Sequence, residues 1–260
     1  MDLIERAAAV DVESTVRHPW ERARLSLAHD LIRRHVPLRQ GSVVLDVGCG
    51  DTFVSEELAR QYPDARFYAV DSAFDDGLID VLRSRLTVPN VSLFQSLDAV
   101  PTAAPAALVL LMDVIEHVPD DVAFLGDICR RPLVGDGTWF LMTVPSFQSL
   151  FSSHDRFLGH YRRYTVRSFR QVFKASRLQS KEEGYFFSTL LPLRVMQLLK
   201  ERVVGSPETF AGLSGWQGSE STSQLIASLL TLDGRISISL ARAGLRIPGL
   251  SNFALCRKSA

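Results

Sequence analysis

The clearest chemical pattern in the sequence is a short run of acidic and glycine residues in the first fifth of the chain. Residues 44–52 read Val-Leu-Asp-Val-Gly-Cys-Gly-Asp-Thr, so an apolar run leads directly into Asp46, Gly48 and Gly50. Glycine lets the backbone approach a ligand closely, because it carries no side chain that would obstruct the contact. The run therefore predicts a ligand-binding turn at the end of a buried strand.

The same turn is unsuited to the phosphates of a dinucleotide. A dinucleotide turn has the pattern Gly-x-Gly-x-x-Gly, and Phe53 stands at its third glycine position. Asp51 lies where a pyrophosphate would approach, and its charge suits a cation, although it could also only cap the following helix. Asp71 follows the next predicted strand, where an acid can accept hydrogen bonds from both ribose hydroxyls. A positively charged nucleoside without phosphates, such as S-adenosylmethionine, fits these features.

A second polar group follows a later apolar run. Asp113, Glu116 and His117 have the i, i+3, i+4 spacing that places three oxygen and nitrogen ligands on one helical face. They could hold a divalent cation, or they could only cap and orient the loop after the strand. We favour the second interpretation and expect no metal, with these three residues as the weak candidates. His117 is also a candidate base, because histidine titrates near neutral pH.

A third group lies beyond the next predicted strand, at residues 154–165. His154 and His160 are candidate bases there, or they hydrogen-bond the backbone of the loop. Arg162 and Arg163 are candidates to hold a carboxylate or a phosphate. Thr165 is expected to cap a helix.

These groups need a scaffold, and the apolar pattern predicts one. Short apolar strands alternate with helices, which is typical of a parallel sheet covered on both faces. The expected strands are 43–47, 66–70, 91–95, 107–112 and 138–144, and the expected helices are 20–36, 53–61, 77–86 and 120–130. The second half is less regular, with helix 165–176, strand 183–187, helix 188–203, a glycine- and serine-rich loop at 205–223, helix 224–243 and strand 250–257.

Composition narrows the class of protein. The chain has 260 residues, of which 46% are apolar, and its 29 basic residues balance its 29 acidic ones. This balance argues against a general nucleic-acid binder, which needs a basic face. Three scattered cysteines indicate a reducing compartment, and no signal peptide or membrane span of about 18–20 apolar residues is visible. We expect a cytoplasmic protein without a transmembrane segment.

At this point the sequence resembles the class I S-adenosylmethionine-dependent methyltransferases. Val44–Thr52 resembles the first motif of that family, Asp71 its ribose-binding acid, and Leu97-Asp98 its adenine-flanking site. Residues 112–118, Met-Asp-Val-Ile-Glu-His-Val, resemble the small-molecule branch that includes the ubiquinone-biosynthesis O-methyltransferases. The resemblance implies a Rossmann-like α/β fold: a doubly wound, seven-stranded, mostly parallel sheet with an antiparallel last strand.

The resemblance also implies roles for individual residues. In the ubiquinone-pathway relatives a similar acid-x-x-Glu-His cluster is associated with a divalent cation. S-adenosyl-L-methionine is the implied cofactor, and the implied cofactor-binding residues are Asp46 and Gly48 at the methionine end, Gly50, Asp71 at the ribose, Leu97 and Asp98 at the adenine, and Met112.

Two further segments are similar to a bacterial subgroup of these enzymes. Residues 144–165 resemble its segment after strand five, and His18–Arg24 resembles its N-terminal helix, which lies over the cofactor mouth. This likeness makes Trp20, Arg162, Arg163 and Tyr164 the candidate substrate-binding residues.

We expect one domain over residues 1–260. It comprises a helical N-terminal cap (1–40), a cofactor-binding core (41–187), a helical insertion or lid (188–247) and a closing strand (248–260).

The expected activity is methyl transfer to a small molecule, with His117, His154 and His160 as candidate bases. The acceptor class includes carboxylates, phosphates and lipid-linked compounds. Nucleic acid is not expected, since no Asn-Pro-Pro-Tyr-like sequence follows the fourth strand. The alternative is a non-catalytic module that binds S-adenosylmethionine, and a nicotinamide-dependent oxidoreductase ranks third. The oligomeric state stays open.

Overall fold

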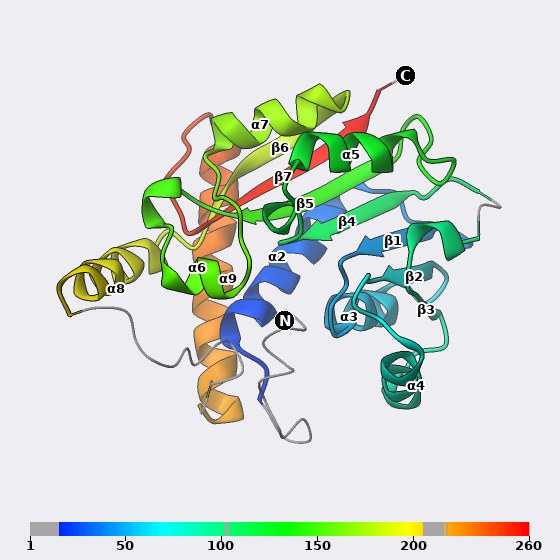
Figure 1. Cartoon of the computed structure of the whole chain (residues 1–260), viewed down its shortest axis with the longest axis horizontal. Coiled ribbons are helices and arrows are strands. Elements are labelled where there is room, and N and C mark those ends of the chain that lie inside the picture. The colour runs from blue at the N-terminus through cyan, green and yellow to red at the C-terminus, as the bar shows by residue number, and fades with distance from the viewer. Residues whose placement is uncertain (1–15, 102–103, 205–215, 217, 260) are drawn as a thin grey trace.

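The computed structural model describes residues 16–101, 104–204, 216 and 218–259. Its centre is one seven-stranded sheet with the strand order β3-β2-β1-β4-β5-β7-β6 (Figure 1). The strands are β1 (Val43–Val47), β2 (Arg66–Val70), β3 (Val91–Phe94), β4 (Leu108–Met112), β5 (Trp139–Pro145), β6 (Leu178–Phe186) and β7 (Ser251–Lys258). β1 to β5 pair in parallel, and β7 runs antiparallel to both of its neighbours. The Rossmann-like sheet expected from the sequence is confirmed.

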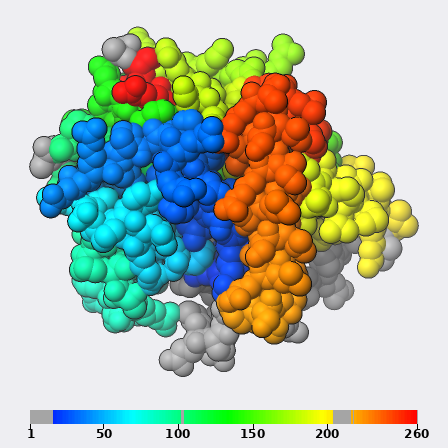
Figure 2. Space-filling model, turned by 180° about the vertical axis from the view of Figure 1, so that it is seen from behind, coloured from blue at the N-terminus to red at the C-terminus, as the bar shows by residue number. Residues whose placement is uncertain are grey.

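Helices cover both faces of this sheet. The longer ones are α2 (Pro19–His35), α3 (Phe53–Gln61), α4 (Asp76–Arg85), α5 (Asp121–Arg130), α7 (Val166–Ala175), α8 (Leu190–Val204) and α9 (Glu220–Arg242). Apolar side chains of α2, α3, α4 and α9 pack on one face, and those of α5 and α7 pack on the other. Figure 2 shows α9 lying alongside α2 across the back of the molecule. Every residue of β1 and β4 is buried, which explains why these strands read as continuous apolar runs.

Local signals in the sequence set where several helices begin. The carboxylates of Asp75 and Asp120 accept hydrogen bonds from backbone N–H groups in the first turns of α4 and α5. Thr165 caps α7 as expected, with its hydroxyl oxygen accepting from the N–H of Ser168 at 3.1 Å. The sequence therefore encodes these starts through single side chains.

Two boundaries in the second half differ from expectation. β6 begins at Leu178, five residues before the expected start, because it pairs along its length with β7 while residues 179–181 face solvent as polar side chains. α9 begins at Glu220, inside the expected loop 205–223, because Ser219 caps it. Most of that expected loop lies outside the described residues.

Three short 3₁₀ turns and one short helix complete the chain that the structure describes. The turns are η1 (Leu97–Ala99), η2 (Ile115–His117) and η3 (Gln148–Leu150), and the helix is α6 (Ser153–Phe157). η2 and α6 carry candidate bases. Among the described helices, none combines the length and apolar character needed to cross a membrane.

Candidate active site

The glycine turn after β1 has the backbone conformation that its sequence predicts. Gly48 and Gly50 have φ angles of 70° and 57°, in the left-handed region that glycine adopts without strain. A β-carbon built on Gly48 would lie 2.7 Å from Cγ2 of Val114, which follows β4. The turn thus packs directly against the segment after β4. This is the point where the strand order reverses, and open α/β sheets bind ligands there.

Asp71 is joined to this turn. It follows β2, and its Oδ2 accepts a hydrogen bond from the N–H of Gly50 at 2.9 Å. Its Oδ1 accepts from the N–H of Ala73, also at 2.9 Å. Two backbone donors therefore fix the half-buried carboxylate at the edge of the crevice.

Asp46 lies deeper, near the end of β1, with 2% of its surface exposed. Its Oδ2 accepts a hydrogen bond from the hydroxyl of Ser55 on α3 at 2.6 Å. Burial raises the pKa of Asp46 to about 6, against the opposing effect of that hydrogen bond. Sequence reasoning did not single out Ser55, although a hydroxyl nine residues after a buried acid was a visible signal.

The other expected cofactor residues follow β3 or end β4. Met112 ends β4 and is buried, and Leu97 is half-buried in the turn after β3. Asp98 is exposed, and its Oδ1 accepts a hydrogen bond from Arg131 at 2.5 Å. The structure joins Asp71 directly to the glycine turn, whereas Asp98 is bonded to Arg131 beyond α5.

Asp51 has an ion-pair partner that sequence reasoning missed. Nη1 of Arg17 lies 2.5 Å from its Oδ2, and the guanidinium of Arg17 stacks 4.2 Å above the ring of Phe53. The other carboxylate oxygen accepts from the N–H of Phe53 at 3.3 Å, at the start of α3. Asp51 therefore does cap the helix, and its negative charge is paired with Arg17.

Asp113 is held apart from Glu116 and His117. Its carboxylate accepts hydrogen bonds from Arg24 of α2 and from the hydroxyl of Thr143, the latter at 2.9 Å. Arg24 was not foreseen, although it stands four residues before Ala28 on the apolar face of a predicted helix. The three weak metal candidates therefore do not converge as a set.

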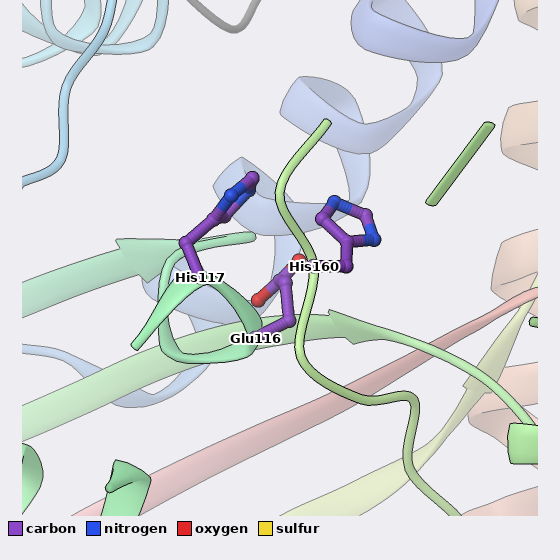
Figure 3. Close-up of side chains that lie close together, drawn as sticks. All are labelled: Glu116, His117 and His160. Carbon is purple, nitrogen blue, oxygen red and sulfur yellow. The ribbon is translucent and has the colours of Figure 1, made fainter. Parts of the chain in front are cut away.

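His160 lies close to Glu116 and His117. Figure 3 shows the three side chains together, with η2 and the loop before α7 as their sources. Their ligand atoms lie within 4.8 Å of one another, and the two imidazole centroids are 4.5 Å apart. Such a cluster can exchange protons or offer three donors to a cation.

Glu116 is the buried member of this cluster, with no exposed surface. Within the described part of the chain, neither oxygen of its carboxylate has a hydrogen-bond partner. Burial, and then the charge of Asp113, raise the pKa of Glu116 well above its usual range.

His154 lies on α6, outside this cluster. It is half-buried, its ring is stacked on Phe157 at 6.5 Å, and burial lowers its pKa. Trp20, on α2, packs under the guanidinium of Arg24 at 4.3 Å. Of the three candidate bases, His117 and His160 therefore lie together, and His154 lies apart from them.

The remaining substrate candidates make contacts within the chain. Arg162 pairs with Asp121 at 3.0 Å, and Nε of Arg163 donates to Asp155 at 2.7 Å. Tyr164 is a core residue rather than a surface residue, because it is buried and its hydroxyl donates to Asp121 at 2.7 Å.

The sheet order, the glycine turn and the acids around it define a class I S-adenosylmethionine-dependent methyltransferase domain. A family model described as a methyltransferase domain matches residues 20–180. The chain belongs to this methyltransferase family.

Curated relatives match a shorter part of the chain. The ubiquinone biosynthesis O-methyltransferase of Xylella fastidiosa (strain 9a5c) is 36% identical over 120 residues, which are 44% of this chain and 46% of the relative. The trans-aconitate 2-methyltransferase of Azoarcus sp. (strain BH72) is 35% identical over 110 residues, 42% of this chain and 41% of the relative. The matches thus span less than half the length of these relatives.

Solved structures support the fold. A phosphoethanolamine N-methyltransferase 2 from Haemonchus contortus aligns with a TM-score of 0.53 and 17% identity, covering 90% of this chain and 52% of that one. A coclaurine N-methyltransferase aligns with a TM-score of 0.54 and 15% identity, covering 92% of this chain and 71% of that one.

Proposed function

We propose that this chain transfers a methyl group from S-adenosylmethionine to a small-molecule acceptor. The observation that carries the proposal is the direct bond between the two predicted cofactor elements, from the N–H of Gly50 to the carboxylate of Asp71. This bond places a half-buried acid beside a turn with two glycines, at the point where the strand order of the sheet reverses. That arrangement suits a nucleoside without phosphates.

The residues present fit the cofactor. Asp71 has a carboxylate fixed in position for ribose hydroxyls, and the Gly48 turn offers backbone without side chains to the methionine portion. Asp46 places a buried acid beneath that turn, which suits a cationic ligand. When bound, S-adenosylmethionine supplies an electrophilic methyl group on a positively charged sulfur.

The protein contributes mainly by positioning. α2 lies over the crevice mouth in this proposal, with Trp20 and Arg24 packed together and Arg24 bonded to Asp113. Holding donor and acceptor in line at near contact supplies much of the rate enhancement in such a displacement. Glu116, His117 and His160 stand at the same edge of the sheet, where the acceptor would enter.

A small-molecule acceptor is supported by the names of the two relatives, one from ubiquinone biosynthesis and one for trans-aconitate. The structure gives less support to an acceptor that would bind through a negative charge. Both arginines expected to bind it, Arg162 and Arg163, already bond to carboxylates of this chain.

Two measurements test the proposal. Calorimetry should detect binding of S-adenosylmethionine and not of NAD, and the reverse result would revive the oxidoreductase. Incubation with methyl-labelled cofactor and a small-molecule cell extract should yield a labelled product. Tight cofactor binding without any labelled product would instead favour the non-catalytic module.

A further inference from the structure

Asp155 is a buried carboxylate that bonds to several residues of the loop between β5 and α7. It has no exposed surface, and its Oδ1 lies 2.9 Å from Nδ1 of His160 and 2.7 Å from Nε of Arg163. Its Oδ2 accepts from the N–H of Ser152 at 2.9 Å and lies 3.6 Å from Arg194 of α8. A fully buried acid with this many donors holds its neighbours in one arrangement.

The bond to Asp155 determines which nitrogen of His160 carries a proton. Burial alone would raise the pKa of Asp155, but hydrogen bonds from His160 and Arg163 outweigh burial and hold it well below its usual range. An ionised carboxylate can only accept hydrogen bonds, so Nδ1 of His160 must be the donor. When the ring is neutral, its lone pair is therefore on Nε2.

The opposite edge of the ring faces the cluster. Figure 3 shows His160 beside His117 and the carboxylate of Glu116, and Asp155 bonds to the Nδ1 side of the His160 ring. Glu116 is the acid of this cluster, and burial, followed by the charge of Asp113, raises its pKa. When the ring is neutral, Nε2 of His160 is thus a proton acceptor beside His117 and the carboxyl group of Glu116.

We propose that Asp155 is a positioning residue that orients His160 as the base for a hydroxyl acceptor. This inference rests on the proposed methyl transfer. The hydroxyl oxygen forms a bond to the methyl carbon as the bond from that carbon to sulfur breaks. The electron pair of the broken bond stays on sulfur, the hydroxyl proton passes to Nε2 of His160, and solvent later takes it.

Other acceptor classes have less need of this arrangement. A carboxylate acceptor has no proton to lose, so it needs no base. A neutral amine attacks through its own lone pair and sheds its proton to water afterwards. A hydroxyl is a poor nucleophile until its proton leaves, and a fixed base removes that proton as the new bond forms.

Several charged and titratable groups surround the proposed base. The groups that face or surround His160 are Asp155 and His154 on α6, Glu116 and His117 on η2, Arg163 on the same loop, and Arg194 on α8. The two arginines keep Asp155 ionised. Asp155 therefore stays charged and keeps Nδ1 of His160 as a hydrogen-bond donor.

The first test needs no acceptor. Nitrogen-15 spectra of the full chain with bound S-adenosylmethionine should show the neutral His160 ring with its proton on Nδ1. Asp155→Asn should shift the ring toward the other form, and Asp155→Glu should largely restore the original one. Glu183→Gln is the matched control, because Glu183 is also a shielded carboxylate held by arginines, Arg170 and Arg246, but has no contact with His160. A wild-type ring protonated on Nε2 would overturn the assignment.

The second test identifies the acceptor atom. Product labelled from methyl-labelled cofactor and cell extract is treated with alkali, which releases methanol from methyl esters and leaves methyl ethers intact. We expect an alkali-stable O-methyl product, whose kcat falls about 100-fold or more in His160→Gln with little change in KM. An ester or an N-methyl product would overturn the hydroxyl class while leaving the proposed function standing. No labelled product despite cofactor binding would overturn both.

If Asp155→Asn fails to fold, His160→Gln and Asp155→Glu still decide the matter. His160→Gln removes the base and leaves Asp155 its bonds to Ser152 and Arg163. Wild-type kcat and pH profile in a folded His160→Gln variant would sink the proposal.

Discussion

A β-carbon on Gly48 would lie 2.7 Å from Cγ2 of Val114, so the cofactor turn and the segment after β4 are in direct contact. Gly48→Ala should therefore destabilise the protein by about 1–3 kcal/mol through overpacking, in addition to the strain of its φ of 70°. Thermal and urea unfolding measure this cost.

Gly159→Ala separates the two contributions. Gly159 has a φ of 74° with nothing within 4 Å of the added carbon, so it should show only the strain, about 1 kcal/mol. In a Val114→Ala background Gly48→Ala should cost less, since the nearest contact is gone. Equal costs for the two glycines would show that packing on Val114 is unimportant.

Asp71→Asn should weaken binding of S-adenosylmethionine by about 1–3 kcal/mol, because the amide cannot accept both the backbone and ribose hydrogen bonds. Calorimetric titration measures the affinity. Asp75→Asn is the control, since Asp75 caps α4 four residues later and has no bond to the glycine turn. Unchanged affinity in Asp71→Asn would refute the ribose assignment.

Asp46→Asn should stabilise the cofactor-free protein at neutral pH. Burial raises the pKa of Asp46 from 3.8 to about 6, so the folded state favours the neutral acid. The wild type has that full stability below pH 3.8 and loses it as pH rises through about 6. The gap to the variant should thus grow from near zero around pH 4 to about 3 kcal/mol at pH 7.

Unfolding of both proteins across this pH range checks the sign, and calorimetry should show weaker cofactor binding by Asp46→Asn at pH 7. A wild type that gains stability over the variant as pH rises would contradict the buried, cofactor-facing acid.

Arg24→Met should destabilise the fold by about 3–5 kcal/mol, the cost of leaving one partner of a shielded ion pair alone. Asp113 would then keep only its bond from Thr143. In an Asp113→Asn background the same substitution should cost much less, and the difference between backgrounds measures the coupling. Additive effects in this double-mutant cycle would mean that the pair ties α2 to β4 only weakly.

Methyl transfer should persist in excess chelator. Asp113, the first of the three weak metal candidates, is already bonded to Arg24, and we propose His160 as a base. The assay compares labelled product with and without chelator, with added Zn²⁺ or Mn²⁺ as the control. If chelator abolished activity and added metal restored it, Glu116, His117 and His160 would be metal ligands, and His160 would not be the base.

The sequence alone determined the cofactor half of the candidate site. Asp46 lies in the first apolar strand, Gly48 and Gly50 follow it, and Asp71 follows the next strand. Parallel strands bring their carboxyl ends to one edge. The positions of these residues depend on backbone conformation and on the order of strands along the chain. Both can be predicted from the spacing of residues in the sequence. The positions of the strands were predictable for the same reason, apart from the start of the exposed edge strand β6, while the family resemblance implied the seven-stranded sheet with its antiparallel last strand.

Tertiary structure alone decided the partners of these side chains. In the sequence, Asp155 is one acid among several arginines. Only the folded loop brings it into contact with His160, whereas the neighbouring His154 stacks on Phe157. Arg17, just before α2, reaches Asp51, and Arg24 of α2 reaches Asp113, although both pairs are distant in sequence. Such pairings depend on how separate elements pack and on which charges burial forces together. The spacing of residues within one segment predicts neither the packing of the elements nor the pairing of the charges.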